Sequence, residues 1–255
     1  MTIKFKNALV RKANNNIVRA LSSKKLQPSF EKINNEHNHY VKALIQIGLN
    51  VSVLESLDDF PDSIFVEDPG LTYKNIYISL RPADKTRYGE SPIMAKEVKK
   101  LFDDIYTVHK GNIEGGDILR INDHFIVGLS SRTNEEGAKN LLRILNSLGA
   151  SIEITKTPKN ILHFKSECSL IDEDTILLTK KMLENNIFKK NYKFIEIPKG
   201  EEIAANSLRI NNNLLIPSGC PKTEEMLSKN YNIIPLKVNE VFKVDAGLSC
   251  MSLRW

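Results

Sequence analysis

The chain alternates helix-like and strand-like patterns in a regular order. Five segments carry apolar side chains at helical spacing, at residues 31–47, 91–102, 134–148, 180–187 and 221–229. Each leads into a short strand-like run, at residues 50–55, 104–108, 151–155, 194–198 and 231–236. Thr133 and Glu136 have the spacing of a capping box and predict the start of the third helix.

Pairs of short β-like segments with turn residues between them separate these units. The pairs are 63–69 with 75–80, 112–121 with 124–130, 161–171 with 175–180, and 206–210 with 214–219. The last such segment, 243–253, has no following partner, so we expect it to pair with the N-terminal run 3–10. The repeated unit is therefore two strands, a helix and a strand, and it occurs five times in 255 residues.

Units of this kind cannot bury their apolar faces singly, so a closed ring is the arrangement that the repeat favours. The sequence thus predicts an α/β fold, a five-bladed ββαβ propeller with pseudo-fivefold symmetry, helices outside and strands around a central channel. A doubly wound open sheet is the alternative, but no Gly-rich phosphate loop follows any predicted strand. Because no linker rich in Pro, Gly or Ser divides the chain, we expect residues 1–255 to form a single domain.

One polar or reactive residue recurs in the first strand of each predicted hairpin, roughly every 45 residues. These residues are Asp68, Glu114, His163, Asn206 and Cys250. Taken alone, a free cysteine is more often a small buried hydrophobe, and a histidine in an apolar run is more often a hydrogen-bonded core residue. Equivalent positions in a ring converge on its centre, however, so two carboxylates, an imidazole and a thiol are predicted to meet at one place.

Charge is distributed unevenly along the chain. The 36 Lys and Arg residues outnumber the 31 Asp and Glu residues, for a net charge of +5. The lysines occur as scattered pairs without interleaved aromatic residues, which argues against a nucleic-acid partner. Acidic residues instead concentrate in 58–68 and 114–117, and this local acidity in a basic protein indicates a small cationic ligand.

The first residues alternate apolar and charged positions, and no stretch approaches the roughly 18 apolar residues of a membrane span. The three cysteines, Cys168, Cys220 and Cys250, are far apart and odd in number, so neither a disulfide framework nor a zinc site is indicated. We therefore expect a protein of the reducing cytoplasm with no membrane partner.

Five motifs spread over the chain resemble those of the dimethylarginine dimethylaminohydrolase family, within the superfamily of guanidino-group-modifying enzymes. They read FVEDP, GNIEGGDI, FIVGLSSRTNEEGA, LHFKS and VDAGLSCMSLRW, and the resemblance runs in register from about residue 8 to the end of the chain. That superfamily has the pentein fold, a five-bladed ββαβ propeller, so the resemblance implies the same architecture as the repeat. It also implies that the single domain is catalytic.

The resemblance implies roles for five residues near the reacting carbon. Cys250 would be the nucleophile and His163 the general acid and base, with Glu114 orienting the imidazole. Asp68 would grip the nitrogen atoms of the substrate guanidinium, and Glu67 beside it would assist or only support.

It implies a further five residues around the rest of the substrate. Arg87 and Arg132 would hold the α-carboxylate, for which a forked guanidinium is well shaped. Asp62 and the loop at Leu21 would take the α-amine and cover the mouth of the site. Asp245 would lie near the guanidinium.

The residue types suit this chemistry for independent reasons. A guanidinium is a poor electrophile that water attacks slowly, and a soft thiolate adds to its carbon more readily, which splits one difficult step into two. An unperturbed thiol is only a few per cent ionised at neutral pH, so nearby positive charge is needed to favour the thiolate. The chemistry requires no metal and no organic cofactor.

Substrate choice within the superfamily rests on one triplet. Arginine deiminases usually carry His-x-Asp, whose second carboxylate clamps the other side of the guanidinium, whereas this chain reads His163-Phe164-Lys165. Because lysine cannot clamp a cation, one guanidinium nitrogen is left free to carry methyl groups. The expected reaction is hydrolysis of Nω-methylated arginine to citrulline and methylamine or dimethylamine.

Three alternatives remain open at this point. They are an arginine deiminase-type hydrolase, an amidinotransferase that uses the same cysteine and histidine, and a non-catalytic propeller that serves as a binding module. The expected partner is a small-molecule substrate, and the sequence leaves open whether the protein is a monomer or a homodimer.

Overall fold

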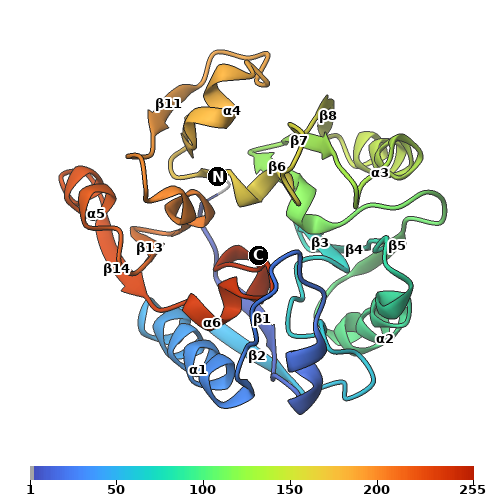
Figure 1. Cartoon of the computed structure of the whole chain (residues 1–255). Helices are drawn as coiled ribbons and strands as arrows, with labels where there is room; N and C mark the ends of the chain where they lie inside the picture. The colour runs from blue at the N-terminus through green and yellow to red at the C-terminus, as the bar shows by residue number, and fades with distance from the viewer. Residues whose placement is uncertain (1–2) are drawn as a thin grey trace.

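Five three-stranded sheets arranged in a ring make up the computed structural model, which describes residues 3–255 (Figure 1). The inner strands are β3 (Gly70–Tyr73), β6 (Ile118–Ile121), β9 (Cys168–Leu170), β12 (Leu208–Ile210) and β15 (Leu253–Arg254). The middle strands are β1 (Asn7–Arg11), β4 (Ile76–Ser79), β7 (His124–Leu129), β10 (Thr175–Leu178) and β13 (Asn213–Pro217). The outer strands are β2 (Asn50–Leu54), β5 (Asp104–Thr107), β8 (Ser151–Lys156), β11 (Lys193–Glu196) and β14 (Asn232–Leu236).

A helix connects the middle strand of each sheet to the outer strand, and these helices lie around the outside of the ring (Figure 1). They are α1 (Phe30–Gln46), α2 (Glu90–Glu97), α3 (Glu135–Ser147), α4 (Lys180–Glu184) and α5 (Pro221–Ser228). A further short helix is α6 (Asn239–Phe242). The 3-10 helices are η1 (Asn15–Arg19), η2 (Lys85–Arg87), η3 (Val98–Lys100), η4 (Gly115–Asp117), η5 (Phe164–Ser166), η6 (Glu202–Asn206) and η7 (Ser249–Met251). Among the described residues, no helix is both long enough and apolar enough to cross a bilayer.

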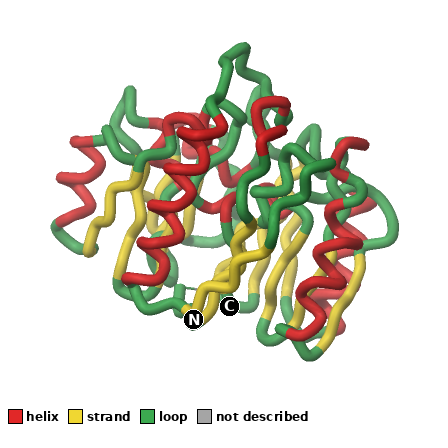
Figure 2. The backbone as a smooth tube through the Cα atoms, turned by 90° about the horizontal axis from the view of Figure 1, so that it is seen from below, coloured by secondary structure: helices red, strands yellow, loops and turns green. Residues whose placement is uncertain are grey.

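The same pairing recurs in all five sheets, which confirms the predicted ββαβ unit. The inner and middle strands are antiparallel, and the middle and outer strands are parallel. The predicted closure is also confirmed, because β15 pairs with β1 through Ala8 opposite Arg254 and Leu9 opposite Leu253. The two chain ends therefore lie side by side at one end of the ring (Figure 2).

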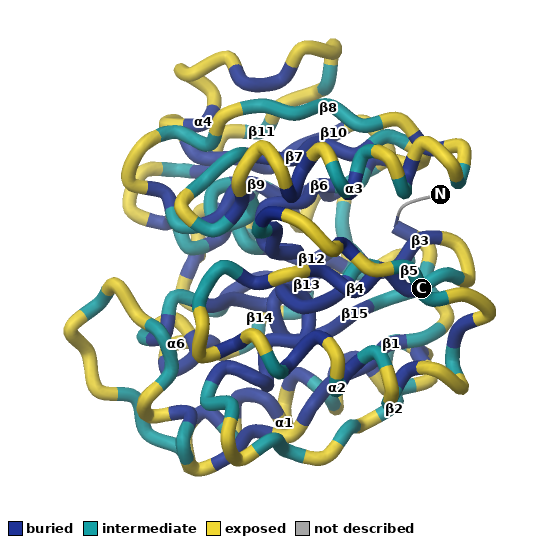
Figure 3. The backbone as a smooth tube through the Cα atoms, turned by 90° about the vertical axis from the view of Figure 1, so that its right-hand side faces the viewer, coloured by how far each residue is buried: buried dark blue, intermediate teal, exposed yellow. Residues whose placement is uncertain are grey.

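Burial explains the near-continuous apolar runs of the middle strands. All four residues of β10 are buried, as are the four central residues of β7. A middle strand has a neighbouring strand on each edge and packs on both faces, so it has no polar side. The outer strands are only partly buried, and exposed stretches fall on the outer helices and loops (Figure 3).

The inner strands begin later than predicted. Residues 63–69 form consecutive turns, and β3 starts only at Gly70. In the other four sheets a short 3-10 helix, η4, η5, η6 or η7, lies directly before the inner strand or is separated from it by one residue. The recurring polar residues were expected in the inner strands, but they lie in the segments that lead into those strands. These residues are Asp68, Glu114, His163, Asn206 and Cys250.

The start of α3 also differs from the expected capping box. The N-cap is Asn134, whose side chain accepts a hydrogen bond from the Gly137 N–H at 2.9 Å. The Thr133 hydroxyl instead accepts the backbone N–H of Glu114 at 3.2 Å. The threonine thus contributes to the central site and not to the helix.

Candidate active site

A small cavity of about 20 Å³ lies where the segments entering the inner strands meet. Eight of the ten predicted site residues line it: Leu21, Asp62, Asp68, Arg87, Arg132, His163, Asp245 and Cys250. Apolar side chains complete the wall: Phe65, Leu162, Val244 and Ala246. The ring therefore gathers side chains from distant parts of the chain, as the repeat predicts.

Local structure places three of the wall residues. Asp62, Phe65 and Asp68 are three residues apart in consecutive turns, since the Phe65 N–H donates to the Asp62 carbonyl and the Asp68 N–H donates to the Phe65 carbonyl. Each turn brings the next side chain back to the same side. The acidic cluster in the sequence thus becomes one acidic wall.

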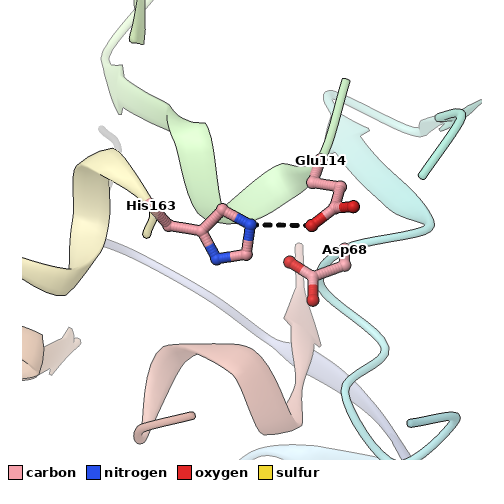
Figure 4. Close-up of side chains that lie close together, drawn as sticks. All are labelled: Asp68, Glu114 and His163. Atoms are coloured by element: carbon pink, nitrogen blue, oxygen red, sulfur yellow. Dashed lines mark hydrogen bonds and ion pairs between the residues drawn. The ribbon is translucent and has the colours of Figure 1, made fainter. Parts of the chain in front are cut away.

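His163 and Glu114 form the centre of the site (Figure 4). The imidazole Nε2 lies 2.7 Å from Glu114 Oε2, and Glu114 is fully buried. The other carboxylate oxygen, Oε1, accepts the backbone N–H of Ala83 at 2.9 Å and lies 3.4 Å from Arg132 Nη1. Glu114 is thereby fixed behind the imidazole, and its geometry suits the expected orienting role.

The charge state of His163 follows from its neighbours. Burial alone would lower its pKa, but the carboxylates of Asp117, Asp68 and Glu114 outweigh burial and raise the pKa to about 9. The imidazole is therefore protonated at neutral pH. The hydrogen bond from His163 in turn keeps the pKa of Glu114 below its usual value, although burial opposes this.

Asp68 lies next to this pair and is held by an arginine. Arg87 Nη1 donates to Asp68 Oδ2 at 2.7 Å, and the Gly116 N–H donates to Oδ1 at 3.3 Å. Burial alone would raise the pKa of Asp68, but Arg87 and His163 lower it overall. Asp68 therefore presents a carboxylate anion to the cavity.

Arg87 has most of its donors engaged within the protein. Its Nε and Nη2 donate to the two carboxylate oxygens of Glu90 at 2.9 and 2.7 Å, and Nη2 also lies 3.3 Å from the Asp62 and Phe65 carbonyls. Arg132 is less constrained, with one side-chain contact to Glu114 and a partly exposed guanidinium. Of the two arginines, Arg132 is the freer to receive an anion.

Cys250 lies in η7, and only 8% of its surface is exposed. Burial, with the carboxylates of Glu67 and Asp68, raises the pKa of its thiol to about 12. The other two cysteines are buried and face no predicted site residue in this cavity. Without a bound cation, Cys250 is a thiol.

Glu67 does not line the cavity, which argues against direct contact between its side chain and the substrate. Its carboxylate pairs with Lys165 and Arg254 and accepts the Ser249 hydroxyl at 2.9 Å. Its backbone N–H donates to the Cys250 carbonyl at 3.2 Å. These contacts favour the supporting role, because Glu67 ties down the turn that carries the nucleophile.

Glu67 and its hydrogen-bonding partners line a second cavity, separate from the site. Glu67, Lys165, Asn206, Ser249 and Arg254 line that cavity, which reaches the inner strands and the N-terminal residues. Asn206, the equivalent residue of the fifth sheet, therefore does not face the site. Its side chain accepts the Ser249 N–H at 2.9 Å and donates to the Lys165 carbonyl at 3.0 Å, so it supports the same turn.

The segment at Leu21 closes over the mouth. The Leu21 N–H points to both oxygens of Asp62, at 3.2 and 3.3 Å. Further along, Asp245 pairs with Lys24 at 2.8 Å and accepts hydrogen bonds from the backbone and hydroxyl of Ser23. Asp245 thus holds the segment that covers the mouth, a structural role that the sequence did not predict.

Two residues of the site were not singled out from the sequence. Glu90 neutralises Arg87, and Asp117 faces His163. The adjacent glycines were a usable signal, since a side chain at Gly116 would place its Cβ 2.6 Å from the His163 Nδ1 atom. Close approach of backbone to a reactive side chain is a common reason for glycine.

Ligand atoms of Asp68, Glu114 and His163 lie within 4.8 Å of one another, a spacing that metal ligands also show. With its raised pKa the imidazole carries a proton on both ring nitrogens at neutral pH, however, and an imidazolium has no lone pair to give. We therefore interpret the three side chains as a proton-carrying cluster.

Comparisons with known proteins agree with this geometry. A family model described as arginine deiminase matches residues 88–246. The chain is 33% identical to an N(G),N(G)-dimethylarginine dimethylaminohydrolase of Pseudomonas aeruginosa, covering 98% of this chain and 100% of the relative. A dimethylarginine dimethylaminohydrolase of Streptomyces coelicolor is 29% identical, over 84% of this chain and 83% of its own length.

A solved structure gives the same result in three dimensions. The Pseudomonas aeruginosa enzyme, as a Cys-to-Ser variant in complex with citrulline, superposes with a TM-score of 0.93 at 32% identity and covers 99% of this chain and 100% of its own. The similarity thus extends over the whole ring and supports an enzyme and not a binding module. The chain belongs to the dimethylarginine dimethylaminohydrolase family.

Proposed function

We propose that the protein hydrolyses Nω-methylated arginines to citrulline and dimethylamine or methylamine. The observation that carries this proposal is the single cavity in which a thiol, a protonated imidazole and a carboxylate anion face one another, from Cys250, His163 and Asp68. These are the groups needed to hold a flat cation, attack its carbon and protonate its leaving amine.

Asp68 binds the guanidinium. A planar cation presents paired N–H donors to a carboxylate, and such charge-assisted bonds fix the carbon beside the sulfur. Asp68 is already held by Arg87 through one oxygen, so the carboxylate is oriented before substrate arrives. The bonds to Asp68 thereby compensate for the cost of removing the guanidinium from water.

The amino-acid end of the substrate lies toward the mouth. Arg132, the freer arginine, takes the α-carboxylate, while Arg87 contributes mainly by fixing Asp68. Asp62 and the backbone at Leu21 take the α-amine. The covering segment then excludes water from the reacting groups.

The first chemical step forms a covalent adduct. With a pKa of about 12, only on the order of 1 in 10⁵ Cys250 side chains is ionised at pH 7. The bound guanidinium places a positive charge against the sulfur, so the thiol loses its proton to solvent as the substrate binds. The thiolate adds to the guanidinium carbon, and His163 gives its proton to the methylated nitrogen, which leaves as the amine.

The second step releases the product. The carbon is now held by sulfur as a thiouronium, and neutral His163 removes a proton from an attacking water. Collapse of that adduct breaks the carbon–sulfur bond, forms citrulline, and restores the thiolate and the imidazolium. The second proton lost from the adduct passes to solvent, where it protonates the released amine. Glu114 keeps the imidazole in one orientation throughout.

Lys165 supports a methylated substrate. Its ammonium points to Glu67, away from the cavity, so no second carboxylate clamps the guanidinium from that direction. One nitrogen is left with room for methyl groups.

All three cysteines are free thiols, which favours a location in the cytoplasm. We take residues 1–255 as one catalytic domain.

Incubation with dimethylarginine, monomethylarginine, arginine and agmatine, followed by measurement of citrulline and the released amine, tests the function. We expect citrulline with dimethylamine or methylamine from the methylated arginines and little from arginine. Citrulline and ammonia from arginine alone would identify an arginine deiminase instead. An amidinated acceptor formed without citrulline would identify a transferase.

A further inference from the structure

Asp117 is a buried carboxylate beside the catalytic histidine that no step of the reaction uses. It is the last residue of η4, three positions after Glu114, and it is 0% exposed. It does not line the substrate cavity. Because a buried carboxylate is costly unless it is paired, its contacts indicate what it does.

The two oxygens of Asp117 hold two separate segments. Oδ1 accepts the backbone N–H of Phe164, the residue after His163, at 2.8 Å. Oδ2 lies 2.7 Å from the Ser130 hydroxyl, in the turn before α3. The Thr133 hydroxyl also hydrogen-bonds to Asp117 and accepts the Glu114 N–H, so Asp117 connects the segments of both members of the proton-carrying pair.

The hydrogen-bond directions favour the anionic form of Asp117. The oxygen of Ser130 already accepts the N–H groups of Arg132 and Thr133, at 3.0 and 3.2 Å. Its hydroxyl hydrogen is therefore free only to donate, and Asp117 Oδ2 must accept. Since Oδ1 accepts the Phe164 N–H, both oxygens act as acceptors, and the neighbouring imidazolium also favours the anion, while burial keeps the pKa of Asp117 raised overall.

Several charged or titratable groups surround the His163 ring. Glu114 and Asp117 face it from the η4 segment, Asp68 faces it from the turn before β3, and Cys250 shares its cavity from η7. Two arginines lie among them. Arg87 pairs with Asp68 as well as with Glu90, and Arg132 contacts Glu114.

Asp117 differs from the other two carboxylates in its partners. The hydrogen bonds that it receives within the described residues come from neutral donors, a backbone N–H and two hydroxyl groups. No arginine or lysine pairs with it in that part of the chain. Its negative charge is therefore compensated mainly by the imidazolium of His163.

We propose that Asp117 is a positioning residue that fixes the His163 backbone and keeps the imidazole protonated in the resting enzyme. This inference rests on the proposed function only in naming His163 as the proton carrier. The charge at Asp117 sets the fraction of molecules in which thiolate and imidazolium coexist, because removing it makes the imidazole a weaker base. The orientation of the ring is left to Glu114.

The test is Asp117→Asn, which has nearly the same shape. Its amide oxygen can still accept the Phe164 N–H, but its NH₂ cannot accept the Ser130 hydroxyl, so the charge and one hydrogen bond are lost together. NMR titration of the His163 ring should show its pKa falling by about 1 to 2 pH units from about 9. The kcat/KM profile should level off at a correspondingly lower pH, with a plateau about tenfold or more lower.

Ser130→Ala is the matched control, since it removes one hydrogen bond to Asp117 but keeps the charge. The pKa of His163 should then stay close to that of the wild type, even if the turn loses stability. Equal pKa shifts in Asp117→Asn and Ser130→Ala would show a merely structural role and overturn the proposal. An unchanged pKa in Asp117→Asn would overturn it as well.

A second variant covers failure of Asp117→Asn to fold. Asp68→Asn with Glu114→Gln leaves Asp117 as the anion that faces the imidazole, so the pKa of His163 should stay at or above the ordinary value of about 6.5. A lower pKa, as burial alone would give, would contradict the proposal. These titrations need no turnover, so they remain decisive even if the proposed reaction is wrong.

Discussion

Replacing Cys250 with serine should abolish turnover, by about 10⁴-fold or more, while substrate still binds. A serine hydroxyl is a far weaker nucleophile and far harder to ionise than a thiol, and nothing in the cavity removes its proton at neutral pH, because His163 already carries one. The groups that hold the substrate are unaltered. Citrulline release and calorimetric binding of dimethylarginine measure the two effects separately.

Cys168→Ser is the control for this prediction. Cys168 is fully buried in a different part of the core, and burial raises the pKa of its thiol. The variant should lose some stability but keep its catalytic rate. Full activity of Cys250→Ser, or inactivation by Cys168→Ser without unfolding, would remove Cys250 from the mechanism.

Replacing Asp68 with asparagine should lower kcat/KM by about 10³-fold. The amide keeps the shape but loses the negative charge that pairs with the guanidinium, and charge-assisted bonds to a buried partner contribute about 2 to 5 kcal/mol. Arg87 retains its bidentate pair with Glu90, so the wall itself should stay in place. Steady-state kinetics with dimethylarginine and a melting temperature for each variant provide the measurements.

Glu67→Gln is the matched comparison, since Glu67 is adjacent in sequence but faces away from the cavity. Its loss leaves Lys165 and Arg254 without their buried partner, so the melting temperature should fall more than in Asp68→Asn. KM should change less. If Glu67→Gln weakened substrate binding more than Asp68→Asn, the two carboxylates would have been assigned the wrong way round.

The ring could be predicted from the sequence because its repeat is strong. Apolar runs in the middle strands and helical spacing in the outer layer recur in every unit, and closure of β15 on β1 follows from the unpaired last segment. The start of the inner strands could not be predicted in this way. Residues such as those of FVEDP have a strand-like pattern, and only tertiary packing makes them turns.

The site was predictable at the level of which residues meet, but not of how they pair. Recurrence in the repeat located Asp68, Glu114, His163 and Cys250. Whether Glu67 or Asp68 faces the substrate depends on a turn, since adjacent side chains point in different directions. The pairing of Arg87 with Glu90 likewise depends on distances in the folded chain, which composition and spacing do not give.

Attack of the Cys250 sulfur on the guanidinium carbon leaves a covalent adduct on the enzyme. Acid quenching during turnover of dimethylarginine, followed by digestion and mass spectrometry, detects that adduct. We expect one adduct on the peptide that contains Cys250, with a mass gain equal to dimethylarginine minus dimethylamine. An adduct on Cys168 or Cys220 would contradict attack by Cys250. So would an active enzyme that shows no adduct on Cys250 when a single turnover is quenched at a series of times.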